Sequence, residues 1–166
     1  ADTLEQLGYQ SESSTFRNAY LTGARELRDG PPKPLNPVGR GRGLLNAMTI
    51  EQIFDTMAIR LKSENVGDVR LAVNWTFTDL TGTPDERWTL ALSHRTLYSV
   101  RSRHEPQAVV SITMTRALLI TVVAQETTFL DGIAQGSIGL EGDAQALLTI
   151  FGNLEVFDAG FGIAEP

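Results

Sequence analysis

The hydrophobic period of this chain changes near residue 69, and that change restricts the folds open to it. From Val69 to Phe77, apolar residues stand at every second position and alternate with polar or small residues such as Arg70 and Asn74. Alternation of this kind is typical of a strand that buries one side and exposes the other. We therefore expect a sheet here, because a helical bundle does not use a period of two.

Further strands are predicted downstream. Asp79–Asp85 contains glycine and proline and is predicted to be a hairpin loop. A second strand should carry Trp88, a third should span Thr96–Arg101 and a fourth Val109–Met114, giving an antiparallel meander of about four strands. Ser137–Glu141 is expected to add a short fifth strand.

Helices are predicted on both sides of these strands. Thr49–Gln52 has the residues of a capping box and starts a helix that runs to about Lys62. Thr115 and Asp143 should cap two further helices, and Thr127–Gln135 should be irregular or a short helix. This order favours an α+β fold, a five-stranded, mainly antiparallel sheet covered by helices. The residues predicted to face inward on the three capped helices are Ile50, Ile53, Phe54, Met57, Leu61, Leu118, Leu119, Val122, Val123, Leu147, Leu148, Phe151 and Leu154.

An isolated helix and an extended arm are predicted before the main domain. Residues recur at spacings of three and four from Phe16 to Leu27, and the prolines after Asp29 end this helix. Residues 31–43 are rich in Pro, Gly and Arg and indicate a linker, so residues 1–30 stand apart from a main domain of residues 44–166. The helix needs a partner for its apolar stripe: a parent protein, a second copy or the main domain. The tail, with Phe157, Phe161 and Ile163, is expected to dock.

Charge and composition exclude several classes of function. The net charge is −6, whereas non-specific nucleic-acid binding needs a basic surface. Arg40 and Arg42 form the one basic cluster, which we interpret as solvated linker and not as a phosphate contact. Cys is absent, which excludes disulfides and thiolate chemistry. No membrane span is predicted, because the segment richest in apolar residues, Ala117–Ala124, is far shorter than about 20 residues. The chain begins with Ala1 and not Met, so we expect a processed or longer parent; a periplasmic, secreted or cytoplasmic location stays open.

Residues with catalytic potential are few. His94 and His104 are the only histidines, and a zinc site needs three or four converging ligands, so we interpret both as surface residues. Ser93 precedes His94, but neighbours on a strand point to opposite faces. Neither a Gly-x-Ser-x-Gly elbow nor a phosphate loop is present. No catalytic residue and no metal ligand is predicted.

A large apolar surface remains unassigned. Bulky side chains on helices over a single sheet can close a core or line a pocket for an apolar ligand. Periodicity by itself favours the closed core. The candidates for lining a pocket are Phe54, Met57, Trp75, Phe77, Trp88, Leu118, Val122 and Phe151.

Several segments resemble alkyl sulfatases of the metallo-β-lactamase superfamily. Phe16–Arg28 resembles the end of their dimerisation region. Other segments resemble their C-terminal domain, which is itself similar to sterol carrier protein type 2. These segments are Asn74–Asp79, Leu90–Leu97, Gly139–Asp143 and Phe161–Pro166. Gly162 stands where the family pattern has Asn.

The resemblance implies an enzyme of three parts: a dizinc hydrolase domain, a helical dimerisation domain and a lipid-binding domain. Residues 1–30 would be a remnant of the second part and residues 44–166 the third. The zinc ligands would lie upstream of residue 1, so no cofactor is expected in this chain and it would not catalyse alone. It would hold or recruit the apolar tail of a long-chain alkyl sulfate. Its partners would be this alkyl or lipid ligand, the upstream metallo-hydrolase domain and a second copy bound through residues 1–30.

Two alternatives stay open. The resemblance makes a pocket and a closed core equally acceptable, so the chain could instead be a structural or interaction domain with a filled core. Such a domain would cap the active site of its parent or support dimerisation. A free-standing hydrolase is the least favoured alternative, because the sequence offers no catalytic constellation.

Overall fold

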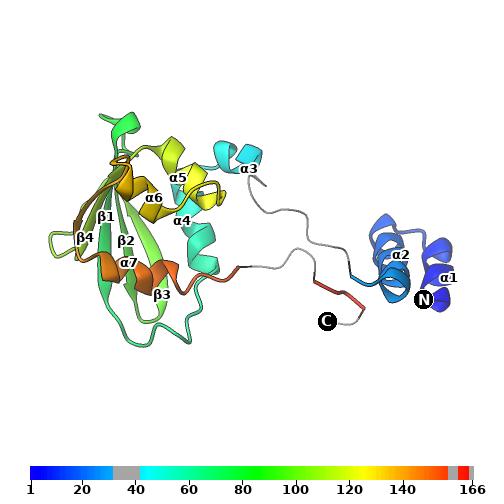
Figure 1. The fold of residues 1–166 in the computed structure, drawn as a ribbon. Coiled ribbons are helices and arrows are strands. Elements are labelled where there is room, and N and C mark those ends of the chain that lie inside the picture. The colour runs from blue at the N-terminus through cyan, green and yellow to red at the C-terminus, as the bar shows by residue number, and fades with distance from the viewer. Residues whose placement is uncertain (32–41, 157–160, 165–166) are drawn as a thin grey trace. The chain divides into compact units, whose positions relative to one another are not determined.

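The computed structural model describes residues 1–31, 42–156 and 161–164 of the 166. Contacts divide the described chain into two units, one made of residues 1–31 and 161–164 and the other of residues 42–156 (Figure 1). Most of the predicted linker, including Arg40, lies outside the described residues, and so does Phe157. Each unit is considered by itself below.

The first unit contains a pair of helices, α1 (Asp2–Gln10) and α2 (Ser14–Asp29). They pack closely where Gly8 of α1 meets α2, since a Cβ atom at this glycine would lie only 2.7 Å from Leu21 Cδ2. The helix predicted after Phe16 is therefore present, but the prediction that it is isolated was wrong. Its partner is α1, which sequence reasoning missed because this segment begins with polar and acidic residues.

Polar contacts also join the two helices. Arg28 donates hydrogen bonds of 2.6 Å to both Asp2 Oδ1 and Glu5 Oε2. These bonds hold the pKa of both carboxyls below their usual values. Tyr9 donates a further bond to Glu5, which raises the pKa of the Tyr9 hydroxyl. Close packing at Gly8 and the hydrogen bonds of the Arg28 guanidinium thus hold α1 and α2 together.

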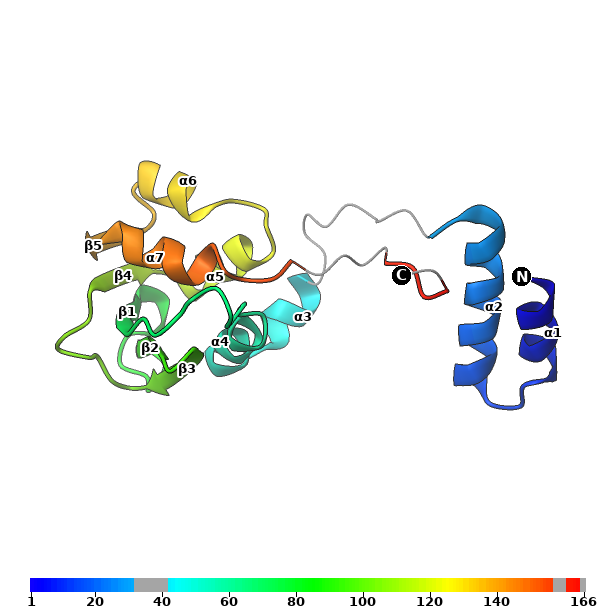
Figure 2. The ribbon, with the colours of Figure 1, turned by 90° about the horizontal axis from the view of Figure 1, so that it is seen from below.

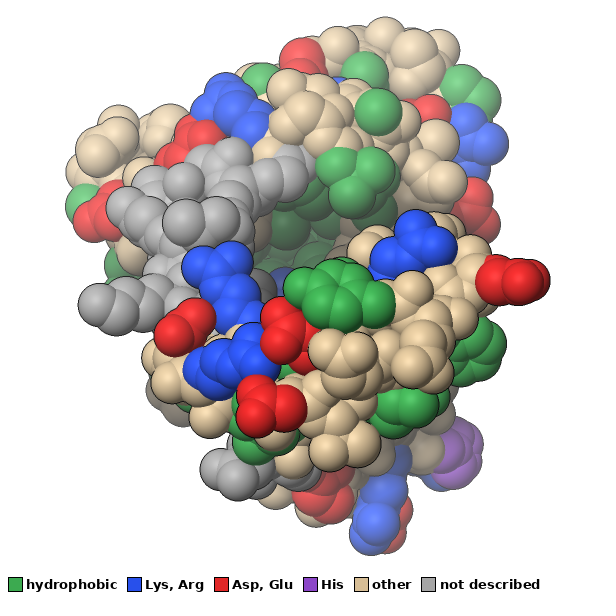
Figure 3. All heavy atoms as spheres, turned by 90° about the vertical axis from the view of Figure 1, so that its right-hand side faces the viewer, with side chains coloured by type: hydrophobic (Ala, Val, Ile, Leu, Met, Phe, Trp, Pro, Cys, Tyr) green, Lys and Arg blue, Asp and Glu red, His purple; other side chains and the backbone are tan. Residues whose placement is uncertain are grey.

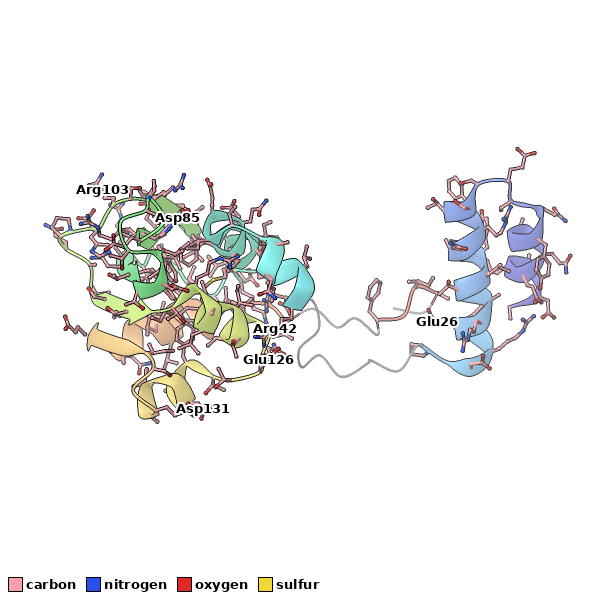
Figure 4. The ribbon with its side chains drawn as sticks, turned by 90° about the horizontal axis from the view of Figure 1, so that it is seen from above. Glu26, Arg42, Asp85, Arg103, Glu126 and Asp131 are labelled. Atoms are coloured by element: carbon pink, nitrogen blue, oxygen red, sulfur yellow. The ribbon has the colours of Figure 1, made fainter. Side chains whose placement is uncertain are left out.

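The closing segment of the chain binds to α2 through its backbone, whereas Phe161 and Ile163, two of the apolar residues from which docking was predicted, are 65% and 47% exposed. Glu26 is buried, with 7% of its surface exposed, and its two carboxylate oxygens accept the backbone N–H groups of Ile163 and Ala164 at 2.7 and 3.0 Å. Figure 4 shows Glu26 on α2 beside this segment. The contact joins residues more than 130 positions apart in the sequence, so no local pattern could predict which helix receives the tail.

The second unit is an α+β domain built on one sheet, and this confirms the predicted fold class. The strands lie in the order β3-β2-β1-β4-β5. Their bounds are β1 (Leu71–Phe77), β2 (Arg87–Ser93), β3 (Thr96–Arg101), β4 (Val110–Met114) and β5 (Gly139–Gly142).

The connection of β4 differs from the prediction. β1, β2 and β3 form an antiparallel meander, but β4 returns to the other side of β1 and pairs with it in parallel. The chain crosses the sheet between β3 and β4, held by Asn74. The Asn74 side chain accepts from Glu105 N at 2.9 Å and donates to Glu105 O at 3.0 Å. Thr89 Oγ1 joins this network 3.0 Å from Asn74 Oδ1. A pattern of apolar residues does not reveal this crossing, because parallel and antiparallel strands alternate alike.

Helices α4, α5 and α7 and the residues that cap them follow the prediction closely. Thr49 makes the complete capping box with Gln52, Thr115 accepts from Leu118 N, and Asp143 accepts from Gln145 N. Two helices differ from the prediction: α3, at the junction of the predicted linker and the main domain, was not predicted, and α6, where Thr128 forms a second capping box, lies in the segment predicted to be irregular or a short helix. The bounds are α3 (Arg42–Ala47), α4 (Ile50–Ile59), η1 (Thr78–Leu80), α5 (Arg116–Val123), α6 (Phe129–Ala134) and α7 (Ala144–Phe151).

The hydrophobic core lies between one face of the sheet and the helices (Figures 1 and 2). Leu148 of α7 was predicted to face inward, but it is 54% exposed, because the buried stripe of this helix runs through Ala146, Leu147 and Ile150. The strand residues that build the core are Val73, Trp75, Phe77, Trp88, Leu90, Leu92, Leu97, Val110, Ile112 and Met114.

Candidate functional site

An aromatic cluster occupies the centre of the core, around Trp75 of β1. The Trp75 ring lies 5.3 Å from that of Phe54 on α4, 6.2 Å from Phe77, 5.9 Å from Phe129 on α6 and 6.3 Å from Phe151 on α7, measured between ring centroids. The tilted and edge-on arrangements are those that aromatic rings favour. Helices distant in sequence thus converge on one strand residue.

The structure brings most of the predicted pocket residues into this region. Phe54, Met57, Trp75, Phe77 and Trp88 are each at most 3% exposed. The remaining three, on α5 and α7, are half-buried. Of these, Leu118 and Phe151 pack against the core, whereas on α5 it is Val123, and not Val122, that joins them.

Sequence reasoning missed one member of the cluster, Phe129. It is half-buried on α6, and its ring lies 4.7 Å from that of Phe151. Two signals could have identified it: the capping box formed by Thr128 and Asp131, and the spacing of four residues between Phe129 and Ile133, both of which pack against the core. The half-buried rings make the wall of the core here more accessible than at α4.

The two tryptophans differ in hydrogen bonding. Trp88 Nε1 donates to Asp85 O at 3.1 Å. Trp75 is completely buried, and its Nε1 is the one buried side-chain nitrogen or oxygen in the described residues with no hydrogen-bond partner. A buried N–H without a partner is unfavourable, so such groups are rare in folded proteins.

The best-defined concavities of the described residues lie elsewhere. Two are next to α2 in the first unit. The third, of about 560 Å³, lies in the second unit, with Ala72, Ala91, Tyr98 and Arg103 among its lining residues. None of the three is lined by a predicted pocket residue.

Both histidines and several charged side chains have local partners. His94 Nε2 lies 3.1 Å from Arg70 Nη2, and His104 Nε2 lies 3.0 Å from the carbonyl oxygen of Trp75. Arg42, predicted to be solvated linker, begins α3 and makes an ion pair with Glu126, as Figure 4 shows. On the face shown in Figure 3, Lys and Arg side chains stand beside Asp and Glu side chains and not in a basic patch.

No metal site or membrane segment was found in the described parts of the chain. Among these residues, no three His, Cys, Asp or Glu side chains are grouped so that they could hold a metal ion. Their helices also include none that combines the length and the apolar character needed to span a membrane.

Comparisons with known proteins give a consistent result. Residues 40–166 match the model of the alkyl sulfatase C-terminal family, and residues 1–30 match that of the alkyl sulfatase dimerisation region. The whole chain is 37% identical to 24% of a linear primary-alkylsulfatase from Pseudomonas sp.. It is also 34% identical to 25% of an alkyl/aryl-sulfatase from Saccharomyces cerevisiae. The chain thus spans about a quarter of the length of the curated relatives it matches.

Solved structures agree with this relationship. A stereoselective inverting sec-alkylsulfatase from Pseudomonas sp. matches 99% of the chain with a TM-score of 0.78 and 34% identity, over 25% of its own length. Sterol carrier proteins match less well: a palmitated one from Aedes aegypti has a TM-score of 0.47 and 18% identity over 66% of the chain, too low to bear on function. Because the family model matches residues 40–166, which is most of the chain, this chain belongs to the alkyl sulfatase C-terminal family.

Proposed function

We propose that this chain is the non-catalytic, alkyl-chain-binding part of an alkyl sulfatase, and that it holds or recruits the apolar tail of a long-chain sulfate ester. The tail would lie between the sheet and helices α5 to α7. The observation that carries this proposal is the half-buried aromatic wall of Phe129 and Phe151 over Trp75, in a member of this family.

Chemistry supports a role in binding. Burying an alkyl chain gains about 0.8 kcal/mol for each methylene group removed from water. In this proposal, catalysis belongs to the metallo-hydrolase domain of the enzyme and not to this chain. The zinc that the family resemblance implies does not fit this chain, because no group of three suitable ligands lies together in the described residues. The metallo-hydrolase domain that would hold it is the expected upstream partner.

Displacement of a fluorescent fatty-acid probe tests the proposal. We expect the chain to bind the probe and dodecyl sulfate to displace it. Phe151→Ala removes a ring from the half-buried wall and should weaken binding about five- to tenfold, since several methylene contacts are lost.

Leu148→Ala is the matched control, because Leu148 lies on the same helix but is 54% exposed. It should bind like the wild type, and circular dichroism should show that both variants are folded. If the wild-type chain binds no alkyl probe at high micromolar concentration, the proposal is wrong.

A second candidate function is a structural role in dimerisation. It is favoured by the match of residues 1–30 to the dimerisation model and by exposed apolar residues on the same hairpin, among them Tyr9 and Phe16, at 65% and 63%. This role can coexist with alkyl-chain binding, because the two involve different units of the chain.

A further inference from the structure

The N–H group of Trp75 has no hydrogen-bond partner among the described residues. It therefore favours a ligand that brings a hydrogen-bond acceptor, whereas apolar packing by itself would not. Its ring is surrounded by Phe54, Phe77, Phe129 and Phe151, none of which can accept a conventional hydrogen bond. The donor therefore lies in an apolar environment without an acceptor among the described residues. The other tryptophan, Trp88, also contacts Phe54, but its N–H donates to Asp85 O. The lack of an acceptor is therefore particular to Trp75 and is not general to the core.

The four rings in contact with Trp75 differ in burial. Phe54 and Phe77 are at most 1% exposed, whereas Phe129 and Phe151 are half-buried. Phe129 also stands on α6, a helix of only 6 residues. Short helices have little stability of their own, so their position depends on side-chain packing. A ligand that displaces the Phe129 ring would therefore come into contact with the Trp75 ring.

The surroundings of Trp75 decide which ligand oxygen suits it. A sulfate group carries a full charge, and moving it into this cluster would require several donors or a cation, but the rings supply neither. An uncharged hydroxyl carries no full charge to desolvate: its oxygen can accept from the single donor, and its own proton can point at the face of a phenylalanine ring, which is a weak acceptor. A long-chain alcohol meets this condition, and it is also what remains of an alkyl sulfate once water has cleaved the ester to alcohol and sulfate.

We propose that the interior of the second unit binds a long-chain primary alcohol with its hydroxyl oxygen accepting a hydrogen bond from Trp75 Nε1. The inference rests on the proposed alkyl-binding function and deepens it. A sulfate ester would insert its tail and leave its charged end at the surface, whereas the alcohol enters with its oxygen inward. The domain then discriminates the uncharged product of the parent reaction from the charged substrate.

Competition experiments on the full 166-residue chain test this assignment. The fluorescent fatty-acid probe is displaced with 1-decanol or with decyl sulfate, in the wild type, in Trp75→Phe and in Trp88→Phe. Trp75→Phe keeps an aromatic ring and removes the donor. It should weaken 1-decanol about tenfold, the effect of one neutral hydrogen bond, and change decyl sulfate less than about twofold. Trp88→Phe is the control and should not change the ratio of the two affinities.

The outcomes separate this inference from the proposed function. If no probe binds to the wild type, both fail. If the probe binds, and Trp75→Phe lowers the affinities for 1-decanol and decyl sulfate equally or changes neither affinity, only the inference fails.

A second measurement decides the matter if Trp75→Phe does not fold. The chain has two tryptophans and so two indole N–H signals in proton NMR, which Trp88→Phe assigns. 1-Decanol should move the Trp75 signal downfield, as a new hydrogen bond does, and leave that of Trp88 in place. An unmoved Trp75 signal while 1-decanol displaces the probe overturns the inference.

Discussion

Gly142 determines how closely the end of β5 approaches β4. Its φ is +102°, and a Cβ atom built on it would lie 2.3 Å from the carbonyl oxygen of Val109. That same oxygen accepts the N–H of Asp143, the residue that caps α7. One glycine therefore joins the last strand, the crossing segment and the start of the last helix.

We predict that Gly142→Ala destabilises the protein by about 2–4 kcal/mol, through the overlap with Val109 and the positive φ together. Gly67→Ala is the control, because Gly67 also has a positive φ, of +56°, but has open space around it. It should cost only about 1 kcal/mol. Urea unfolding followed by circular dichroism measures both, and equal losses would show that the close contact does not matter.

Asn74 is buried, although its position in the alternating sequence predicts that it is exposed. In the sequence it stands on the solvent-facing side of the alternating strand. In the structure it is only 7% exposed, because the segment between β3 and β4 crosses over it. A buried amide that has its hydrogen bonds satisfied stabilises one arrangement of the crossing over others.

At the scale of elements, α6 differs from α4, α5 and α7, the longer helices of the second unit. It has 6 residues, only Gly132 is buried among them, and Leu130 is 74% exposed. The Thr128–Asp131 capping box satisfies the backbone groups at its first turn. We therefore expect this cap to contribute a large share of the stability of α6.

Thr128→Ala should cost about 1 kcal/mol, the usual effect of losing an N-cap, and the loss should be local to α6. Hydrogen exchange of residues 129–134 should then speed up about fivefold, with strand β1 unchanged. Thr49→Ala removes the equivalent cap of α4, whose inner face is deeply buried, and should leave α6 exchange unaltered. A uniform increase across the domain in Thr128→Ala would mean that α6 does not open on its own.

At the scale of the whole molecule, the chain consists of two units that differ in their exposed and buried apolar side chains. The α1–α2 hairpin matches a dimerisation region and carries exposed apolar side chains, and the α+β unit carries the aromatic cluster. Glu26 adds a link within the first unit, since it ties the end of the chain to α2.

We predict that the chain forms a homodimer through residues 1–30, and that introducing charge on the hairpin breaks it. Tyr9→Asp combined with Phe16→Asp should give a monomer in sedimentation equilibrium at micromolar concentration, because burying two carboxylates in an apolar interface is strongly unfavourable. Ile59→Asp, at a 79% exposed position of the second unit, should remain dimeric. Monomers in all three cases, the wild type included, would contradict the prediction.

The sequence by itself determined the elements whose signals are local. The capping residues Thr49, Thr115 and Asp143, and the alternation through Trp75, act over two to four positions, and each is found where it was predicted. The α+β class followed from their order. The family resemblance likewise depended on short motifs that are visible without a structure.

Only the tertiary structure decided the features that depend on distant residues. These are the parallel pairing of β4 with β1, the α1 partner of α2, the burial of Asn74 and the exposure of Leu148. The unpaired N–H of Trp75 belongs with them, because it depends on rings from four separate segments. The physical reason is common to all. Hydrogen bonds and packing between segments far apart in the chain depend on how those segments contact each other, and the hydrophobic periodicity of one segment contains no information about its distant partners.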